Sequence, residues 1–407
     1  MPASRLTVIE EDQPVSLSVS QRVQRVKPSP TLAVTALAAE LRAQGRDVIG
    51  LGSGEPDFDT PEHIKAAAIQ AIKAGQTKYT AVDGTAELKT AIINKFLRDN
   101  SLEYAPEQIL VSSGAKQTCY NVCNAVLNPG DEAIIPAPYW VSYPEMVKLA
   151  DGEPVIVSAN IDDNFKITPD ALAATITERT KLLFLNSPSN PTGAAYSRAE
   201  LAALGDVLLE HPGIVVATDD MYEHIYWADD PFTSLAEACP GLYDQTVTIN
   251  GVSKCYAMTG WRIGYCGGPK NIIQAMKKIQ SQSTSNACSI AQAASVAALD
   301  GDQSCIPEWT AAFKQRHDYV VAALNDINGI NCAPGDATFY AFPNVAGAIE
   351  AKGLENDTAL AELLLNEAEV ALVPGSAFGA PGYIRLSFAT GLDTLKEAIG
   401  RIARVLG

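Results

Sequence analysis

The sequence predicts an α/β protein in which helices sandwich a mostly parallel sheet, accompanied by a smaller α+β domain. From about residue 108 to 268, short apolar runs, polar loops and amphipathic helices alternate, which is typical of a parallel sheet covered by helices. After residue 325 the pattern changes to alternating strands, within residues 330–345 and 382–390, around two helices. The chain has 407 residues, which is long for a single core and favours two lobes.

The composition is that of a globular protein and argues against two classes of partner. Hydrophobic residues make up 47% of the chain and charged residues 19%, which is ordinary for a folded protein. The formal net charge of −17 repels nucleic-acid phosphates and anionic lipid. We therefore expect no nucleic acid and no membrane as partner, and an anionic ligand would need locally placed cations.

Cysteine usage and the lack of long apolar runs indicate a cytoplasmic protein. The eight cysteines are scattered, without a CxxC pair followed by a second pair or by a histidine pair, which predicts reduced thiols and no metal site. No run of about 18 apolar residues occurs, so a membrane span lacks support. Residues 1–20 carry acids and Pro14 and are predicted to form a flexible arm rather than a targeting peptide.

Two helices are predicted in the first part of the chain. Leu and Ala recur at helical spacing over residues 31–44, and Gly45 ends this helix. The second helix follows a Pro/Asp loop, with Asp59 or Thr60 as its N-cap and Pro61 in its first helical position.

A glycine cluster between these helices could suggest a dinucleotide site. Gly50, Gly52 and Gly54 follow a short strand. In a dinucleotide-binding motif the glycines open a helix directly, whereas here they lead into the Pro/Asp loop. We therefore do not assign a dinucleotide site to this segment.

A loop that carries Tyr79 and a helix entered through Thr85 and Glu87 precede the repeating part of the chain. A strand then ends at Ser112, and residues 113–116 open the next helix. Free N–H groups and the positive end of the helix dipole both face this junction, so it suits an anion.

Polar or aromatic residues follow five of the predicted strands, at the end of each. The strands are predicted within residues 108–112, 132–138, 181–186, 213–219, 246–254 and 260–268. The residues that follow them are the Gly114 turn, Trp140, Asn190, Asp219 and Lys254. Open α/β sheets bind ligands beyond the carboxyl ends of their strands. One such residue is usually an ordinary loop residue, but five on one edge predict a site.

Lys254 lies in a stretch, residues 250–265, whose only other charged residue is Arg262. Most lysines are solvated surface residues, and the stretch alone leaves that interpretation open. A lysine activated by partial burial can, however, form a Schiff base with an aldehyde cofactor.

The other residues at this edge match the remaining parts of such a cofactor. Asp219 could stabilise a protonated pyridine nitrogen, and an aromatic residue could stack on the ring. The helix start at Gly114, together with Arg262, would bind a phosphate. Arg385 lies between apolar neighbours in the last strand and could grip a carboxylate, although a structural salt bridge explains it equally well. These requirements describe pyridoxal 5′-phosphate.

Six motifs then carry a resemblance to a known family: SxGAKQ, PYWVSYPEM, NSPSNPTG, DxxY, VSKxxxMTGWRIGY and YIRLSFA. Over about residues 20–405 the chain resembles the fold type I aminotransferases that depend on pyridoxal 5′-phosphate, specifically the class I aspartate aminotransferases of the bacterial aspartate/prephenate branch. The resemblance implies a homodimer with shared active sites. It also implies four segments: a flexible arm (1–20), the N-terminal part of a small domain (21–60), a large cofactor-binding domain (61–325) and the C-terminal part of the small domain (326–407).

The resemblance implies roles for the residues that match these motifs. Lys254 would hold the cofactor as a Schiff base and, once freed, move the proton between the substrate's α-carbon and the cofactor's C4′. Asp219 would hold the pyridinium proton, and Tyr222 and Asn190 would hydrogen-bond the phenolic oxygen and lower the pKa of the imine. Trp140 would stack on the ring. The phosphate would be bound by Gly114, Ala115, Ser253, Arg262 and the partner subunit's Tyr79.

The α-carboxylate of the substrate would, by the same resemblance, be bound by Arg385. Trp140, Asn190 and the backbone of Gly54 would lie around it.

The resemblance implies that the distal carboxylate of the substrate is bound by other residues than in animal-type aspartate aminotransferases. Those enzymes bind it with an arginine of the neighbouring subunit. No arginine occurs here between Arg262 and Arg316. The branch that this chain resembles uses the lysine of GAKQ, here Lys116, helped by a hydroxyl of the N-terminal segment, which we place at Thr31 with Ser29 as second choice. A single lysine is geometrically less demanding than a bidentate arginine, which agrees with use of larger dicarboxylates such as prephenate.

The expected reaction is transfer of the amino group of L-aspartate to 2-oxoglutarate, in a ping-pong cycle through pyridoxamine phosphate. One departure affects side-chain preference: the loop often written GAFY in the family reads DATFY at 336–340. A transaminase of aromatic or neutral amino acids, or a C–S lyase, is the alternative within the cofactor class. A non-catalytic sensor is the alternative outside it, but an acidic chain with no room for a DNA-binding domain before residue 20 disfavours it.

Overall fold

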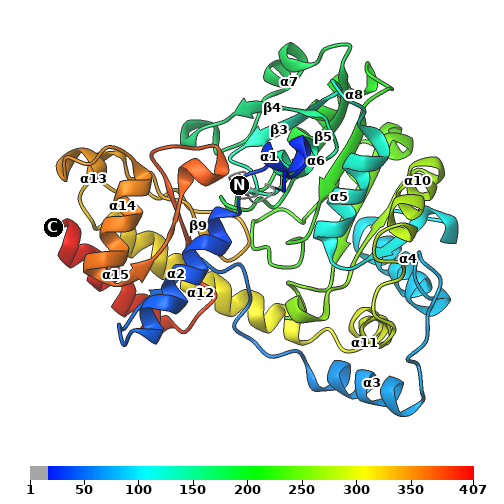
Figure 1. The fold of residues 1–407 in the computed structure, drawn as a ribbon, viewed down its shortest axis with the longest axis horizontal. Coiled ribbons are helices and arrows are strands. Elements are labelled where there is room, and N and C mark those ends of the chain that lie inside the picture. The colour runs from blue at the N-terminus through cyan, green and yellow to red at the C-terminus, as the bar shows by residue number, and fades with distance from the viewer. Residues whose placement is uncertain (1–16) are drawn as a thin grey trace, which may run out of the picture.

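The computed structural model describes residues 17–407; residues 1–16, and with them most of the predicted flexible arm, lie outside the described residues. A large sheet is covered by helices on both faces, and two small sheets lie beside it (Figure 1). The prediction of an α/β fold with a mostly parallel sheet is confirmed. No helix within residues 17–407 is long and apolar enough to cross a membrane.

The large sheet has seven strands in the spatial order β2-β8-β7-β6-β5-β3-β4. All run parallel except β8, which is antiparallel to both neighbours. The register pairs Asn186 with Asp219 and Asp219 with Ile249, so β5, β6 and β7 end close together at one edge. The seven strands are β2 (Ile109–Ser112), β3 (Glu132–Ala137), β4 (Glu153–Ser158), β5 (Thr180–Asn186), β6 (Val215–Asp219), β7 (Thr246–Gly251) and β8 (Gly264–Gly267).

Side chains alternate between the two faces of this sheet and pack against different helices. In β5, Leu182 and Phe184 belong to one core cluster, and Leu183 and Leu185 belong to another. The first face packs against α5 (Ala115–Val126), α6 (Tyr143–Leu149) and α10 (Lys270–Ser281). The opposite face is covered by α4 (Ala86–Asn100), α7 (Pro169–Thr175), α8 (Arg198–Leu209), α9 (Leu235–Ala238) and α11 (Ser289–Asp300). Helix α3 (Glu62–Lys73) packs against α11.

The two small sheets are built from segments at both ends of the chain. One pairs β1 with β10 in parallel, and the other is antiparallel in the order β11-β12-β9. Their strands are β1 (Ile49–Gly50), β9 (Tyr340–Ala341), β10 (Val370–Ala371), β11 (Val373–Pro374) and β12 (Ile384–Ser387). The remaining helices are α1 (Gln21–Gln24), α2 (Pro30–Ala43), α12 (Cys305–Asn325), α13 (Ala346–Ala351), α14 (Asp357–Leu363) and α15 (Leu392–Leu406).

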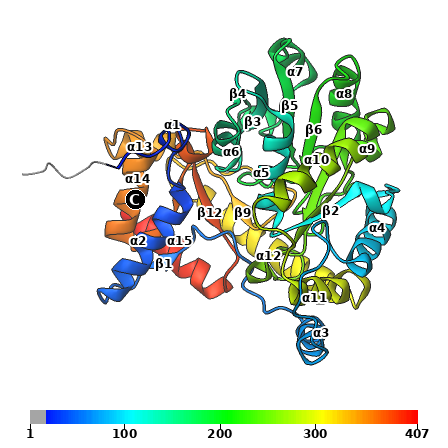
Figure 2. The same cartoon turned by 45° about the vertical axis from the view of Figure 1, so that its right-hand side comes forward.

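Figures 1 and 2 show α2, α13, α14 and α15 grouped on one side of the molecule, away from the large sheet. Helix α12 runs from the large-sheet side toward this group and contacts α15 and β9. We propose that the two groups are the large and small domains, with the boundaries predicted from the sequence.

The predicted cap of α3 is wrong. The helix begins at Glu62, and Pro61 occupies the N-cap position without a side-chain cap. The hydroxyl of Thr60 instead donates to the carbonyl of Ala257 (2.7 Å) and accepts from the indole N–H of Trp261 (3.0 Å). Thr60 therefore ties this loop to the segment after Lys254.

Two predicted strands are shorter than their sequence patterns suggested. Residues 260–268 form a strand only from Gly264, because Arg262 has a left-handed backbone with φ +58°. Within 330–345 only Tyr340 and Ala341 form a strand, because Thr338 has φ +71° and interrupts the extended backbone. Arg262 itself and Tyr340, two residues after Thr338, line the same cavity.

Candidate active site

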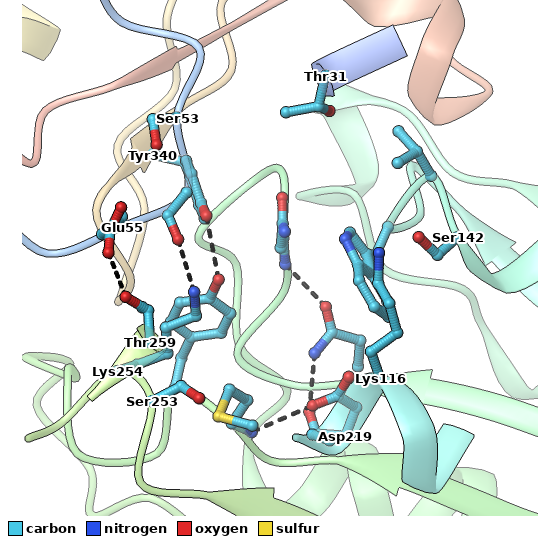
Figure 3. A pocket seen from close by; sticks show the side chains of 18 of the residues that line it. Thr31, Ser53, Glu55, Lys116, Ser142, Asp219, Ser253, Lys254, Thr259 and Tyr340 are labelled. Carbon is cyan, nitrogen blue, oxygen red and sulfur yellow. Dashed lines mark hydrogen bonds between the residues drawn. The ribbon is translucent and has the colours of Figure 1, made fainter. Parts of the chain in front are cut away.

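A cavity of about 420 Å³ lies at the carboxyl edge of the large sheet and is bounded on its other side by the small sheets. It collects most of the residues predicted from the sequence, although they are distant from one another in the chain (Figure 3). The predicted residues that line it are Ser29, Thr31, Gly54, Ala115, Lys116, Trp140, Asn190, Asp219, Tyr222, Ser253, Lys254, Arg262 and Arg385.

Lys254 follows β7 and reaches into this cavity. Its amine donates a hydrogen bond of 2.6 Å to the carbonyl of Gly54, and it lies 5.9 Å from the ring centre of Phe339. Burial lowers the pKa of the Lys254 amine to about 8, because an apolar environment disfavours the charged form. Near neutral pH a larger fraction of this lysine than of an ordinary lysine is therefore the nucleophilic neutral amine.

Asp219 is the last residue of β6 and lines the same cavity. It is buried, and burial raises the pKa of its carboxyl. The hydroxyl of Tyr143, on α6, donates to its Oδ2 at 2.6 Å, and the backbone N–H of Met221 lies 3.3 Å from its Oδ1. These contacts fix the orientation of a carboxylate that faces the cavity.

The junction between β2 and α5 forms an anion site with Arg262. Gly114 has φ +89°, and a side chain there would overlap the guanidinium of Arg262. The guanidinium donates to the carbonyl of Thr259 at 2.8 Å. The N-terminus of α5, which begins at Ala115, adds free N–H groups and the positive end of the helix dipole. Glycine is thus required so that the arginine can approach the helix start.

Arg385, in β12, is only 2% exposed and also lines the cavity. Its guanidinium donates to the side-chain oxygen of Asn190 (2.9 Å) and to the carbonyl of Gly52 (2.7 Å). Its Nε has no partner within residues 17–407, and a buried charged group needs one. No carboxylate bridges to this arginine in that part of the chain, so a salt bridge does not explain its position.

The rim of the cavity carries Lys116 and the start of α2. The amine of Lys116 lies 4.9 Å from the ring centre of Trp140, and burial followed by the charge of Arg262 lowers its pKa. Ser29 caps α2, since its hydroxyl accepts from the N–H of Leu32 (3.4 Å). The hydroxyl of Ser29 still has its own proton to donate, so both Thr31 and Ser29 offer a donor to a ligand in the cavity.

Gly114 adjoins the cavity through Arg262 without lining it, and Tyr79 is the predicted site residue that the structure places away from the cavity. Its side chain is 92% exposed and lies in a separate surface depression. The adjoining backbone is nevertheless fixed: Gln292 accepts from the N–H of Thr85 (2.8 Å) and donates to the hydroxyl of Thr80 (3.1 Å). Tyr79 is thus held outward on an ordered loop.

Among the lining residues that were not singled out from the sequence, Tyr143, Tyr340 and Asn186 make hydrogen bonds to or beside the predicted site residues. Tyr143 and Tyr340 stand inside motifs that were recognised, but the motifs alone assign them no contact. Asn186 is the last residue of β5, in register with Asp219. Its position at the end of a predicted strand was the one feature of the sequence that could have identified Asn186 as a site residue.

Comparison with known proteins agrees with this geometry. Residues 46–402 match the family described as aminotransferase class I and II. The chain belongs to this family.

Among its relatives, the chain is 58% identical to the aspartate/prephenate aminotransferase of Nitrosomonas europaea over 96% of this chain and 100% of that protein. It is similar to the crystal structure of the aspartate aminotransferase from Rhizobium meliloti (TM-score 0.93, 48% identity, 96% and 99% of the two chains). It is also similar to the Thermus thermophilus aspartate aminotransferase with maleate (TM-score 0.90, 42% identity, 96% and 100%).

The lowered pKa of Lys254 predicts how the reaction of its amine with an aldehyde depends on pH, in protein from which bound small molecules have been removed. Only the neutral amine attacks a carbonyl, so capture of pyridine-4-carboxaldehyde at Lys254 should rise with pH and reach half its maximum near pH 8. Borohydride trapping at a series of pH values, followed by peptide mass spectrometry, measures this. The Lys254→Ala variant supplies the blank, and a midpoint near 10.5, the ordinary value, would contradict the assignment.

Proposed function

We propose that this chain is an aminotransferase that uses pyridoxal 5′-phosphate to transfer the amino group of L-aspartate to 2-oxoglutarate, giving oxaloacetate and L-glutamate, and that it also accepts prephenate. The observation that carries the proposal is the convergence of the Lys254 amine and the buried Asp219 carboxylate in a cavity that is also lined by Arg262, Lys116 and Arg385. The aspartate and aspartate/prephenate aminotransferases among its relatives support the choice of substrates.

The residues present fit this cofactor. The anion site formed by Gly114 and Arg262 suits the phosphate of the cofactor. The guanidinium lies so close to the start of α5 that it leaves no room for a side chain at position 114. Asp219 suits the pyridine nitrogen, Trp140 offers a ring for stacking, and the Lys254 amine suits the aldehyde. When bound, pyridoxal 5′-phosphate supplies an electron sink that makes the substrate's α-proton removable.

Lys254 has two tasks in this proposal. Its amine would hold the aldehyde carbon, for which it must be neutral, and burial lowers its pKa to about 8. Once displaced by the substrate's amino group, the same amine would accept the proton from the substrate's α-carbon. The carbonyl of Gly54, which accepts from the amine at 2.6 Å, holds it at the cavity wall.

Asp219 would hold a proton on the pyridine nitrogen. Burial alone raises the pKa of its carboxyl, but a cation beside a buried carboxylate favours its charged form. The Tyr143 hydroxyl, which donates at 2.6 Å, also stabilises the carboxylate and keeps it oriented. Tyr222 and Asn190 would contact the phenolic oxygen of the ring.

The two carboxylates of the substrate would bind at different parts of the cavity. Arg385 would bind the α-carboxylate, and its buried Nε supplies a donor that lacks a partner within the described residues. Lys116, with the hydroxyl of Thr31, would bind the distal carboxylate. Lys116 is a point charge over the ring of Trp140 rather than a rigid fork, which suits substrates of different length.

The function is tested with protein loaded with pyridoxal 5′-phosphate. Aspartate should bleach the absorbance of the lysine-bound cofactor, and 2-oxoglutarate or prephenate should restore it, because the amino group leaves with the second substrate. Lys254→Ala should bind the cofactor but show no such cycle. Bleaching with release of pyruvate and no recovery would favour a lyase instead, and transamination by Lys254→Ala at the wild-type rate would refute the assignment.

The distal site predicts a selective effect of Lys116→Ala. Loss of a charge that pairs with the distal carboxylate should raise KM for dicarboxylates by roughly tenfold, and should spare alanine as substrate. Steady-state kinetics with aspartate and alanine measure this. Lys148→Ala is the matched control, because Lys148 pairs with Glu145 on α6 and does not line the cavity. Equal losses for both substrates would show that the distal site lies elsewhere.

We also propose a cytoplasmic homodimer with shared active sites. Tyr79 is exposed, yet its loop is fixed by Gln292, which is the arrangement expected of a residue that serves the phosphate of another protomer. The eight cysteines are free thiols, which agrees with a reducing compartment.

The shared site is tested by mixing two impaired variants at a cofactor concentration too low to saturate Tyr79→Ala. Tyr79→Ala should weaken cofactor binding, and Lys254→Ala should abolish turnover. After dissociation and reassociation, mixed dimers contain one site with both residues intact, so activity should partly return. Each variant carried alone through the same procedure is the control. Failure of the mixture to exceed the sum of the controls would contradict a shared site.

A further inference from the structure

Tyr340 lines the cavity. The proposed function assigns it no contact with the cofactor or the substrate. It is 1% exposed, and its ring faces the guanidinium of Arg385 at 4.4 Å. Its hydroxyl lies 3.1 Å from the hydroxyl of Tyr222. A side chain at position 54 would overlap the same hydroxyl. Tyr340 therefore contacts both the residue proposed for the phenolic oxygen and the residue proposed for the α-carboxylate.

An unusual backbone conformation brings Tyr340 to this position. Thr338 is fully buried and has φ +71°, a region that β-branched residues rarely adopt. In a regular strand, neighbouring side chains point to opposite faces, yet Phe339 and Tyr340 both contact the ring of Tyr222, with centroids 5.6 and 5.9 Å away. Strain of this kind persists where the surrounding structure enforces it, which is often at functional sites.

The direction of the hydrogen bond between the two tyrosines follows from their proton count. Each hydroxyl carries one proton, and burial raises the pKa of both, so both are neutral donors near pH 7. If Tyr222 donates its proton to the phenolic oxygen of the cofactor, it can only accept from Tyr340.

We propose that Tyr340 is a positioning residue whose hydroxyl donates to Tyr222 and thereby strengthens the hydrogen bond that Tyr222 gives to the phenolic oxygen of pyridoxal 5′-phosphate. This inference rests on the proposed function. In a chain of hydrogen bonds, a hydroxyl that accepts one bond is polarised and becomes a better donor in the next. The buried surroundings of both tyrosines exclude the water that would otherwise compete for these bonds.

The chain of hydroxyls has a measurable consequence for the lysine-bound cofactor. Donation to the phenolic oxygen stabilises its negative charge and weakens its attraction for the proton on the neighbouring imine nitrogen. The pKa of that nitrogen is therefore lower with the Tyr340 hydroxyl than without it. Removal of this hydroxyl alone should move the titration to higher pH.

The test is a pH titration of the cofactor absorbance in Tyr340→Phe, loaded with pyridoxal 5′-phosphate and without substrate. We expect the midpoint to rise by about 0.3 pH unit relative to the wild type. The phenylalanine ring keeps the packing on Arg385, so the fold should be preserved, as thermal unfolding would show. An unchanged or lower midpoint would overturn the inference.

A second comparison asks whether Tyr340 acts through Tyr222. In a Tyr222→Phe background the relay is already broken, so Tyr340→Phe should add no further shift. A shift of the same size in both backgrounds would show that Tyr340 acts on the cofactor by another route and would overturn the inference.

Tyr104→Phe is the matched control. Tyr104 is 3% exposed, and its hydroxyl lies 3.1 Å from that of Thr248, but it does not line the cavity. Its substitution should leave the midpoint unchanged, and a shift equal to that of Tyr340→Phe would overturn the inference. If the wild type shows no pH-dependent cofactor absorbance at all, the proposed function fails, and the inference fails with it.

Discussion

The side-chain amide of Asn186 holds together the sheet edge on which the site depends. Its Nδ2 donates to the backbone carbonyl of Asp219 at 2.7 Å, and its Oδ1 accepts from the N–H of Asn190 at 2.8 Å. Asn190 in turn accepts from Arg385, which also donates to Gly52. One amide thus links the end of β6 to the loop after β5, and through that loop to the small sheets. The relative positions of the acid and the arginine follow from this series of bonds.

Burial has opposite effects on the pKa values of the two reactive groups and the same effect on their charge. It raises the pKa of Asp219 and lowers that of Lys254, so each is moved toward its neutral form. The two therefore do not behave as a strong internal ion pair, and both remain able to interact with a ligand. The cations around them, Arg262, Lys116 and Arg385, are concentrated in one cavity of a chain whose net charge is −17.

The sequence predicted those parts of the molecule that depend on local patterns. The strand that ends at Asp219 and the strand that ends shortly before Lys254 were found because apolar runs and polar ends recur along the chain. The contacts of Tyr143 and Tyr340 could not be read in this way, since each depends on another segment folding over it. The left-handed Thr338 gives no local signal, because its conformation is imposed by its surroundings. Thr60 also could not be placed from local sequence. Its side chain is suited to cap α3, but it donates to the carbonyl of Ala257, in a distant part of the chain, instead.

The contact between Gly54 and Tyr340 restricts how related sequences can diverge. A methyl group built at position 54 would overlap the phenolic oxygen of Tyr340 but lie 3.6 Å from the ring carbon that bears it, which is an ordinary contact. The hydroxyl alone therefore excludes alanine at 54. In relatives that keep this backbone, alanine at position 54 should occur together with phenylalanine at position 340, and glycine at 54 together with tyrosine at 340. The two positions should therefore evolve as a pair.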